Sequence, residues 1–157
     1  MRFTSPTRVL IVAHQTADSR ALTEVVARRA DAGLCAFTLM VPASSHGLHR
    51  VVDPEDHGLA EAERRLEDAI PLLSGAAGSE VIGMIGSHEP FAAVQDALNL
   101  FGFDEVIVSM LPARLSRWLR LDLPRKVRAL GVPVTEVMGV DSGTSTLRVR
   151  PTELPAA

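Results

Sequence analysis

The arginine-rich stretch toward the end of the chain is the strongest candidate for binding chemistry. Positions 114–128 hold six basic residues against one acid, in a chain of net charge -3 at pH 7. Arg114, Arg117 and Arg125 belong to this stretch, and the planar guanidinium group suits phosphate because it donates two parallel hydrogen bonds. The default interpretation is an ordinary amphipathic surface helix, since apolar residues alternate with the arginines. The functional alternative is that these arginines bind a small anion.

Five histidines offer acid–base or metal-binding groups in two different contexts. His46, His49 and His57 lie in a polar stretch that lacks cysteine ligands and fixed geometry, so we favour a surface loop over a metal site. His14 and His88 follow predicted strands and could exchange a proton across a crevice. A histidine bonded to backbone or solvent is the more common arrangement, so we predict no catalytic residue.

Other reactive residues lack a catalytic setting. No G-x-S-x-G string surrounds a serine, so acyl transfer has no visible machinery. The one cysteine, Cys35, can form neither an internal disulfide nor a thiolate metal site, which fits a reducing compartment. Gly83 and Gly86 form a lone G-x-x-G pair, which indicates turn and packing geometry rather than a dinucleotide site. The sequence thus favours a binding protein over an enzyme.

The elements that position these residues alternate along the chain. Short β-branched runs followed by segments with apolar residues three and four apart are typical of parallel βα units. Strands are predicted over 8–13, 36–41, 81–85, 105–109 and 134–137. Helices are predicted after a cap at Asp18 or Ser19, after Asp53 and Pro54, over 91–101 and over 125–130, with a loop over 74–78. Their expected buried faces hold Leu59, Ala62, Leu66, Ile70 and Leu73 in the second helix and Phe91, Val94, Leu98 and Phe101 in the third.

These elements predict an α/β fold, an open five-stranded parallel sheet with helices on both faces. Ligands of such sheets bind beyond the carboxyl ends of the strands, which limits the site to loops 13–18, 42–53, 86–90 and 109–125. Val41 ends the second strand, and Gly86 and Ser87 follow the third.

Length and composition indicate one domain over residues 1–157, with a core at 8–137 and an extension at 138–157. No stretch approaches the roughly 20 apolar residues of a membrane span, and the first residues do not resemble a signal-peptide core. We therefore expect a cytoplasmic protein with no membrane partner. Nucleic acid is not expected, because the chain is acidic overall and only 4% aromatic.

The order and spacing of several strings resemble the universal stress protein family over about residues 8–137. The resemblance implies a cytoplasmic protein with an open five-stranded α/β sheet of the adenine nucleotide alpha hydrolase-like type. The strings that carry it are 9–22, Gly86-Ser-His-Glu-Pro90 with Ala97, 103–108, Leu115-Ser116-Arg117 and Val132-Pro133-Val134.

The resemblance also allows a prediction about ATP binding. Family members that bind ATP carry a G-x2-G-x9-G-[ST] loop after the fourth strand, whereas this chain has Ser109 and Pro112 at the first two glycines and Leu121 or Asp122 at the third. These residues obstruct the approach of backbone N–H groups to phosphate, and proline also removes a donor. His14 stands where the family has a nucleotide-contacting aspartate. We therefore expect no ATP binding in the usual mode.

The resemblance implies a homodimer formed along the fifth strand. Val134, Val137 and Val140 would make this sheet edge apolar, and an open edge leaves backbone groups unpaired. The strand-like segment 144–149 either supports that pairing or folds back to cover the edge.

Two functions remain. The favoured one is a non-catalytic, dimeric stress-response or regulatory binding domain without a cofactor. The alternative is a protein that holds ATP or another adenine nucleotide through its altered arginine-rich loop and hydrolyses it slowly at most. For either, the candidate contact residues are His14, Val41, Gly86, Ser87, Ser109, Pro112, Arg114, Arg117, Asp122 and Arg125.

Overall fold

The structure is a computed structural model, and it describes residues 4–43, 54–112, 118 and 122–139. Strands and helices alternate along these ranges, as the periodicity predicts. The elements are β1 (Thr7–Val12), α1 (Arg20–Ala32), β2 (Cys35–Pro42), α2 (Pro54–Ala77), β3 (Ile82–Gly86), α3 (Pro90–Phe101), β4 (Glu105–Met110), α5 (Leu123–Arg128) and β5 (Val134–Met138).

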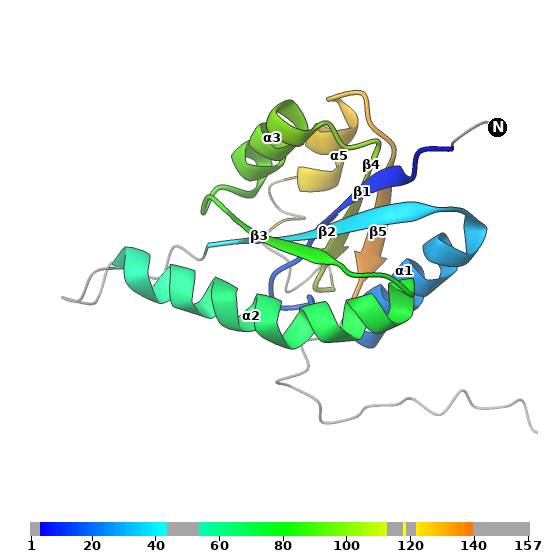
Figure 1. Cartoon of the computed structure of the whole chain (residues 1–157). Helices are drawn as coiled ribbons and strands as arrows, with labels where there is room; N and C mark the ends of the chain where they lie inside the picture. Colours follow the sequence, from blue (N-terminus) through cyan, green and yellow to red (C-terminus); the bar gives the residue numbers. More distant parts are fainter. Residues whose placement is uncertain (1–3, 44–53, 113–117, 119–121, 140–157) are drawn as a thin grey trace, which may run out of the picture.

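The five strands form one parallel sheet in the order β3-β2-β1-β4-β5 (Figure 1). The chain first builds outward from β1 to β3, then returns to the other side of β1 with β4. The junction between β1 and β4 is therefore the point where the direction of strand addition reverses, which is where open α/β sheets place ligands. The predicted fold class is confirmed.

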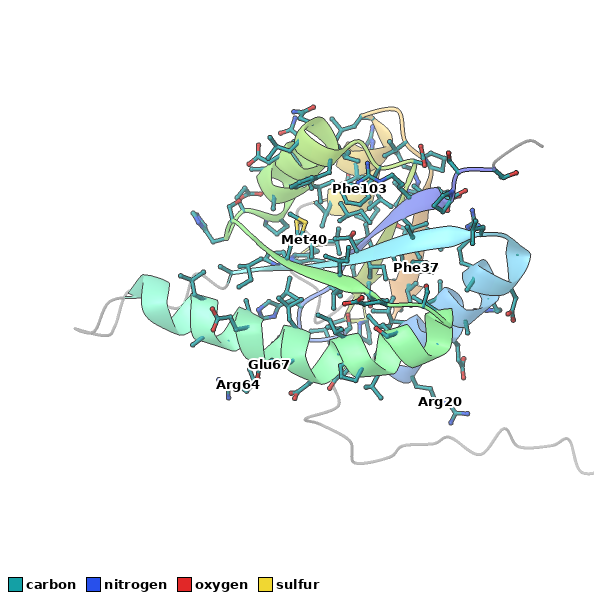
Figure 2. The ribbon with its side chains drawn as sticks, in the orientation of Figure 1. Arg20, Phe37, Met40, Arg64, Glu67 and Phe103 are labelled. Carbon is teal, nitrogen blue, oxygen red and sulfur yellow. The ribbon has the colours of Figure 1, made fainter. Side chains whose placement is uncertain are left out.

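Helices cover both faces of the sheet, with α1 and α2 on one side and α3 and α5 on the other (Figure 1). Side chains alternate along each strand, so Val9 and Ile11 pack under α1 and α2 while Leu10 packs on the opposite face. In Figure 2, Met40 lies between the sheet and α3, whereas Arg20 projects outward from α1. Each face thus has its own buried core.

The helix α2 is longer than predicted, because it continues through the predicted loop at 74–78 as far as Ala77. Ser74 accounts for the difference. Its carbonyl accepts the Gly78 N–H at 3.0 Å, and its hydroxyl accepts the Val81 N–H at 3.0 Å. Gly78 then ends the helix with a φ of 68°. The serine that suggested a loop instead joins the last turn of the helix to the next strand.

Two predicted buried faces need correction. Leu59 of α2 is 44% exposed and Phe101 of α3 is 48% exposed, so neither belongs to the core. On α3 the small residues Ala93 and Ala97 are buried beside Val94. Small side chains are required there because α3 lies close to the end of β3.

Gly83 and Gly86 confirm the packing interpretation of the G-x-x-G pair. A Cβ on Gly86 would lie 2.8 Å from the Cβ of Ala93 and 2.9 Å from the Sδ of Met40. A Cβ on Gly83 would lie 2.6 Å from the terminal methyl group of Ile70. The two glycines therefore let helices approach both faces of the edge strand.

We predict that Gly86→Ala lowers the free energy of unfolding by about 1–3 kcal/mol, because the added methyl group meets atoms that cannot move away cheaply. Gly83→Ala should lower the free energy of unfolding by less, since the end of the Ile70 side chain can rotate away. Urea denaturation measures both. Gly75→Ala is the matched control, since a Cβ there meets nothing within 4 Å. Wild-type stability of Gly86→Ala would contradict the packing role.

Candidate functional site

The candidate residues gather at the carboxyl edge of the sheet, as far as they are described. His14 follows β1, Val41 lies in β2, Ser109 lies in β4 and Pro112 follows it. Gly86 and Ser87 stand at the exit of β3, and Asp122 and Arg125 belong to the start of α5. The predicted contacts Arg114 and Arg117 lie outside the described residues, as does Leu121, one of the two possible positions of the third loop glycine.

A hydrogen bond between two buried hydroxyl groups lies at the junction of β1 and β4. The Oγ1 of Thr16 and the Oγ of Ser109 are 2.6 Å apart, and each residue is only 1% exposed. This bond ties the loop after β1 to the last residues of β4, across the point where such sheets bind ligands. Ser109 was predicted as a ligand contact, but its hydroxyl is engaged within the protein.

The loop between β1 and α1 uses its own backbone donors. The Ala17 N–H donates to the carbonyl of His14 at 3.2 Å, and the Ser19 N–H donates to that of Thr16 at 3.0 Å. The Ser19 hydroxyl accepts the Leu22 N–H at 3.2 Å and so caps α1. The N–H groups of Ala17, Ser19 and Leu22 are therefore engaged within the protein.

His14 and Asp18 complete this loop. His14 is half-buried, and both residues have interaction partners, so neither is a free group directed at solvent. His88 follows β3, and β2 lies between the strands of the two histidines. Two strand spacings of roughly 4.8 Å put the exits of β1 and β3 about 10 Å apart. The acid–base alternative for His14 and His88, which the sequence does not favour, stays untested.

The exits of β2 and β3 are less suited to a ligand than predicted. The Val41 side chain is fully buried in the core, and the space beside Gly86 is filled by packing atoms. The Ala43 N–H donates to the Gly86 carbonyl at 2.9 Å and joins the two exits. Of the candidates Val41, Gly86 and Ser87, only Ser87 is exposed, and its hydroxyl donates to the Glu89 carbonyl at 3.3 Å. Val41 and Gly86 thus have packing roles, and their predicted ligand contacts stay predictions.

Asp122 has the backbone conformation that glycine favours, with φ 55° and ψ 39°. Among the described residues it is the one non-glycine with positive φ. The family pattern places its third loop glycine at 121 or 122, so Asp122 stands at or next to a position where the family has glycine. Aspartate tolerates this conformation better than most residues. Its carboxylate brings negative charge to a position that glycine leaves neutral.

The described arginines of the basic stretch have acidic neighbours. Arg125 Nη1 lies 3.6 Å from an Asp122 carboxylate oxygen, and Arg128 Nη2 lies 3.3 Å from Glu136. The Arg125 side chain is 84% exposed, so this pair contributes little to stability, but it reduces the positive charge offered to an anion. The described part of the stretch is a largely solvated face.

The strongest ion pair lies at the opposite end of the sheet. Arg29 of α1 donates two hydrogen bonds to Glu105 at the start of β4, at 3.0 and 2.7 Å. These bonds raise the pKa of Arg29. Burial raises the pKa of the nearby Cys35 thiol, which disfavours the reactive thiolate. This pair therefore holds α1 on the sheet, away from the candidate site.

Metal ligands do not converge in the described residues. No group of three His, Cys, Asp or Glu side chains there could hold a metal ion. His46 and His49 lie outside the described residues, as does the side chain of His57.

Within the described ranges, no helix combines the length and apolar character that crossing a membrane requires.

Comparison with known proteins identifies the fold. No protein-family model matches the sequence, and no curated protein sequence matches it. Solved structures do match. A universal stress protein from Archaeoglobus fulgidus superposes with a TM-score of 0.60 at 13% identity, over 83% of this chain and 93% of that one. UspA from Lactobacillus plantarum superposes with a TM-score of 0.56 at 12% identity, over 85% of this chain and 99% of that one.

Some of the similar structures hold nucleotides. A universal stress protein in complex with cAMP has a TM-score of 0.59 at 12% identity, over 87% of this chain and all of that one. The chain therefore has a universal stress protein-like α/β fold, in agreement with the strings that suggested it. At these identities the likeness shows the fold alone.

The hydroxyl pair gives a test of how firmly the β1–β4 junction is closed. We predict that Ser109→Ala and Thr16→Val each lower the free energy of unfolding by about 1–3 kcal/mol, because each leaves one buried hydroxyl without its partner. The double variant should lose less than the sum, since no unpaired hydroxyl remains. Thermal or urea unfolding measures this cycle. Ser87→Ala, at an exposed hydroxyl, is the control. Additive losses would mean that the two groups do not interact.

Proposed function

We propose that this protein is a non-catalytic binding domain of the universal stress protein type, cytoplasmic and regulatory, which does not bind ATP in the usual mode. The observation that carries the proposal is the buried Thr16–Ser109 hydrogen bond across the β1–β4 junction. A nucleotide at this edge would need N–H donors and space beside the fourth strand. There Thr16 and Ser109 are each 1% exposed, and the Ala17 and Ser19 N–H groups already donate within the loop.

The energetic argument concerns the phosphate groups. Each hydrogen bond from backbone to a charged oxygen is worth about 1.5–3 kcal/mol. Pro112 has no N–H to donate, and the loop donors before α1 serve Thr16 and His14 instead. Loss of two or three such bonds raises a micromolar dissociation constant to beyond millimolar. The Asp122 carboxylate adds repulsion.

The alternative function is an adenine-nucleotide-binding protein with an altered loop and at most slow hydrolysis. Two observations favour it. The topology keeps the β1–β4 junction, and solved structures with this fold include complexes with cAMP and with dAMP. The left-handed backbone at Asp122 also preserves one feature of a glycine loop. In this case Arg125 and other arginines of the basic stretch would bind the phosphate groups, or a simpler small anion.

We further propose a homodimer formed along β5, which in the described part of the chain pairs with β4 on one side only. The apolar edge is not built as predicted, because Val137 is 4% exposed and packs under α1, and Val134 packs against the opposite core. Val140 and segment 144–149 lie outside the described residues. The available groups are the outward backbone N–H and C=O groups and Met138, which is 53% exposed.

Isothermal titration with MgATP tests whether the chain binds this nucleotide. We expect a dissociation constant weaker than about 1 mM, because the phosphate cradle is missing. The full chain carrying Ser109→Gly, Pro112→Gly and Asp122→Gly is the matched variant, and tighter binding by it would assign the weakness to these positions. Micromolar binding by the wild-type chain would contradict the proposal and favour the alternative.

Assembly is measured by light scattering at tens of micromolar. We expect twice the 16.8 kDa of one chain, because an uncovered edge strand pairs readily. Met138→Lys should shift the mass toward the monomer by placing charge on this edge. Leu100→Lys, on a side chain 74% exposed on α3, should leave the dimer intact. A species of 16.8 kDa alone in the wild type would refute the dimer.

A further inference from the structure

The strand β3 forms one edge of the sheet and lacks the charges and prolines that usually protect such edges. Its five residues are Ile-Gly-Met-Ile-Gly. In the described part of the chain it pairs with β2 on one side only, and it borders the sheet in Figure 1. Ile82 is 63% exposed, and the exposed Gly83 has no side chain to shield its backbone. This edge is therefore open to a further strand.

The directions of the backbone groups of β3 decide which ones a further strand could use. The Gly86 carbonyl accepts an N–H group from the end of β2, so Gly86 faces inward. Residues of a parallel strand alternate in direction, so Ile82 and Met84 also face β2. Gly83 and Ile85 then point away from the sheet. Each offers one N–H and one C=O group to a neighbour.

The strand is complementary to a second copy of itself. Antiparallel pairing centred on Met84 places Ile82 opposite Gly86 of the second copy. It likewise places Ile85 opposite Gly83, so each isoleucine faces a residue without a side chain. The Gly83–Ile85 pairs are the hydrogen-bonded ones, because both residues point outward, and each pair exchanges two hydrogen bonds. Shape and hydrogen bonding thus agree on one register.

The groups at the two ends of β3 agree with the same register. Glu80 precedes the strand and His88 follows it, and both are exposed. Antiparallel pairing brings the Glu80 carboxylate toward His88 of the second copy, whose imidazole N–H can donate to it. Parallel pairing in register would instead oppose two Glu80 carboxylates. Charge therefore favours the antiparallel arrangement.

The helix beside this edge leaves space for a second copy. α2 packs on both β2 and β3, and its Leu66 and Ile70 side chains lie against Gly83. With strands about 4.8 Å apart, a two-fold axis just beyond β3 sets the two α2 helices about 10 Å apart, which suits packed helices. Arg64 and Glu67 project from the side of α2 opposite the sheet (Figure 2), so they do not oppose their counterparts.

We propose that β3 binds a second copy of this chain in an antiparallel pairing about a two-fold axis at Met84, which makes the two sheets continuous. Because only five residues of each copy pair, the contact is weak and forms at high protein concentration. It uses the edge of the sheet opposite to β5. The contact therefore does not depend on a dimer along β5, and it would join such dimers to one another.

Cysteine substitutions test the register. In a Cys35→Ser background at about 200 μM protein, Met84→Cys should form an intermolecular disulfide on mild oxidation, because opposed residues of a non-hydrogen-bonded pair have Cα atoms about 4.5 Å apart. Ile82→Cys is the matched control. Ile82 is more exposed than Met84, but the two copies of residue 82 would lie roughly 14 Å apart.

The comparison of these two variants gives a clear outcome. We expect at least about fivefold more disulfide-linked dimer from Met84→Cys than from Ile82→Cys, because only the former places its thiols within bonding reach. Random collisions would favour the more exposed position 82 instead. Equal or greater linkage through residue 82, or none through residue 84, would overturn the proposal.

Light scattering measures the contact without an introduced thiol. We expect the mass of the wild-type chain to grow beyond two chains between about 20 and 500 μM. Ile82→Lys should abolish this growth and leave the β5 dimer intact, whereas Leu100→Lys, at a comparably exposed apolar side chain, should change neither. Met138→Lys should leave pairing through β3, limited to two chains. Absence of growth in the wild type, or growth that Ile82→Lys does not affect, would overturn the proposal.

Discussion

The hydrogen bond between Thr16 and Ser109 is the constraint on which the carboxyl edge depends. Both hydroxyl groups are excluded from water, so loss of either partner leaves a buried polar group unsatisfied. The bond joins the loop after β1 to the end of β4, which are neighbours only because β4 returns to the middle of the sheet. The topology brings the two segments together, and these two side chains bind them to each other.

Other contacts of the β1–α1 loop also hold this edge of the sheet in place. Ser19 caps α1 with its hydroxyl, Ala17 and Ser19 donate their N–H groups within the loop, and Gly139 lies against both Ser19 and Thr16. Opening the edge would therefore break several contacts at once. A ligand could do so only by replacing them with stronger bonds.

Much of the fold could be predicted from the sequence, because buried parallel strands and amphipathic helices leave a periodic pattern. The prediction of a loop at 74–78 was wrong. Serine and glycine are common in loops, but here Ser74 accepts hydrogen bonds from the N–H groups of Gly78 and Val81. The Thr16–Ser109 pair left no such pattern: a single hydroxyl in a loop is ambiguous until its partner, 93 positions away, is placed. The left-handed backbone of Asp122 is equally invisible, since it depends on the path of the chain.

Asp122 shows how a fold can keep the geometry of a loop while its chemistry changes. A φ of 55° costs free energy for a non-glycine residue, so the surrounding structure must hold Asp122 in this conformation. The conformation persists because Leu123 and Pro124 are buried in the core directly after it, so packing fixes the start of α5. Packing thus preserves the backbone independently of any ligand. Side chains near it are then free to diverge, which is why the shared fold alone does not assign a nucleotide to this protein.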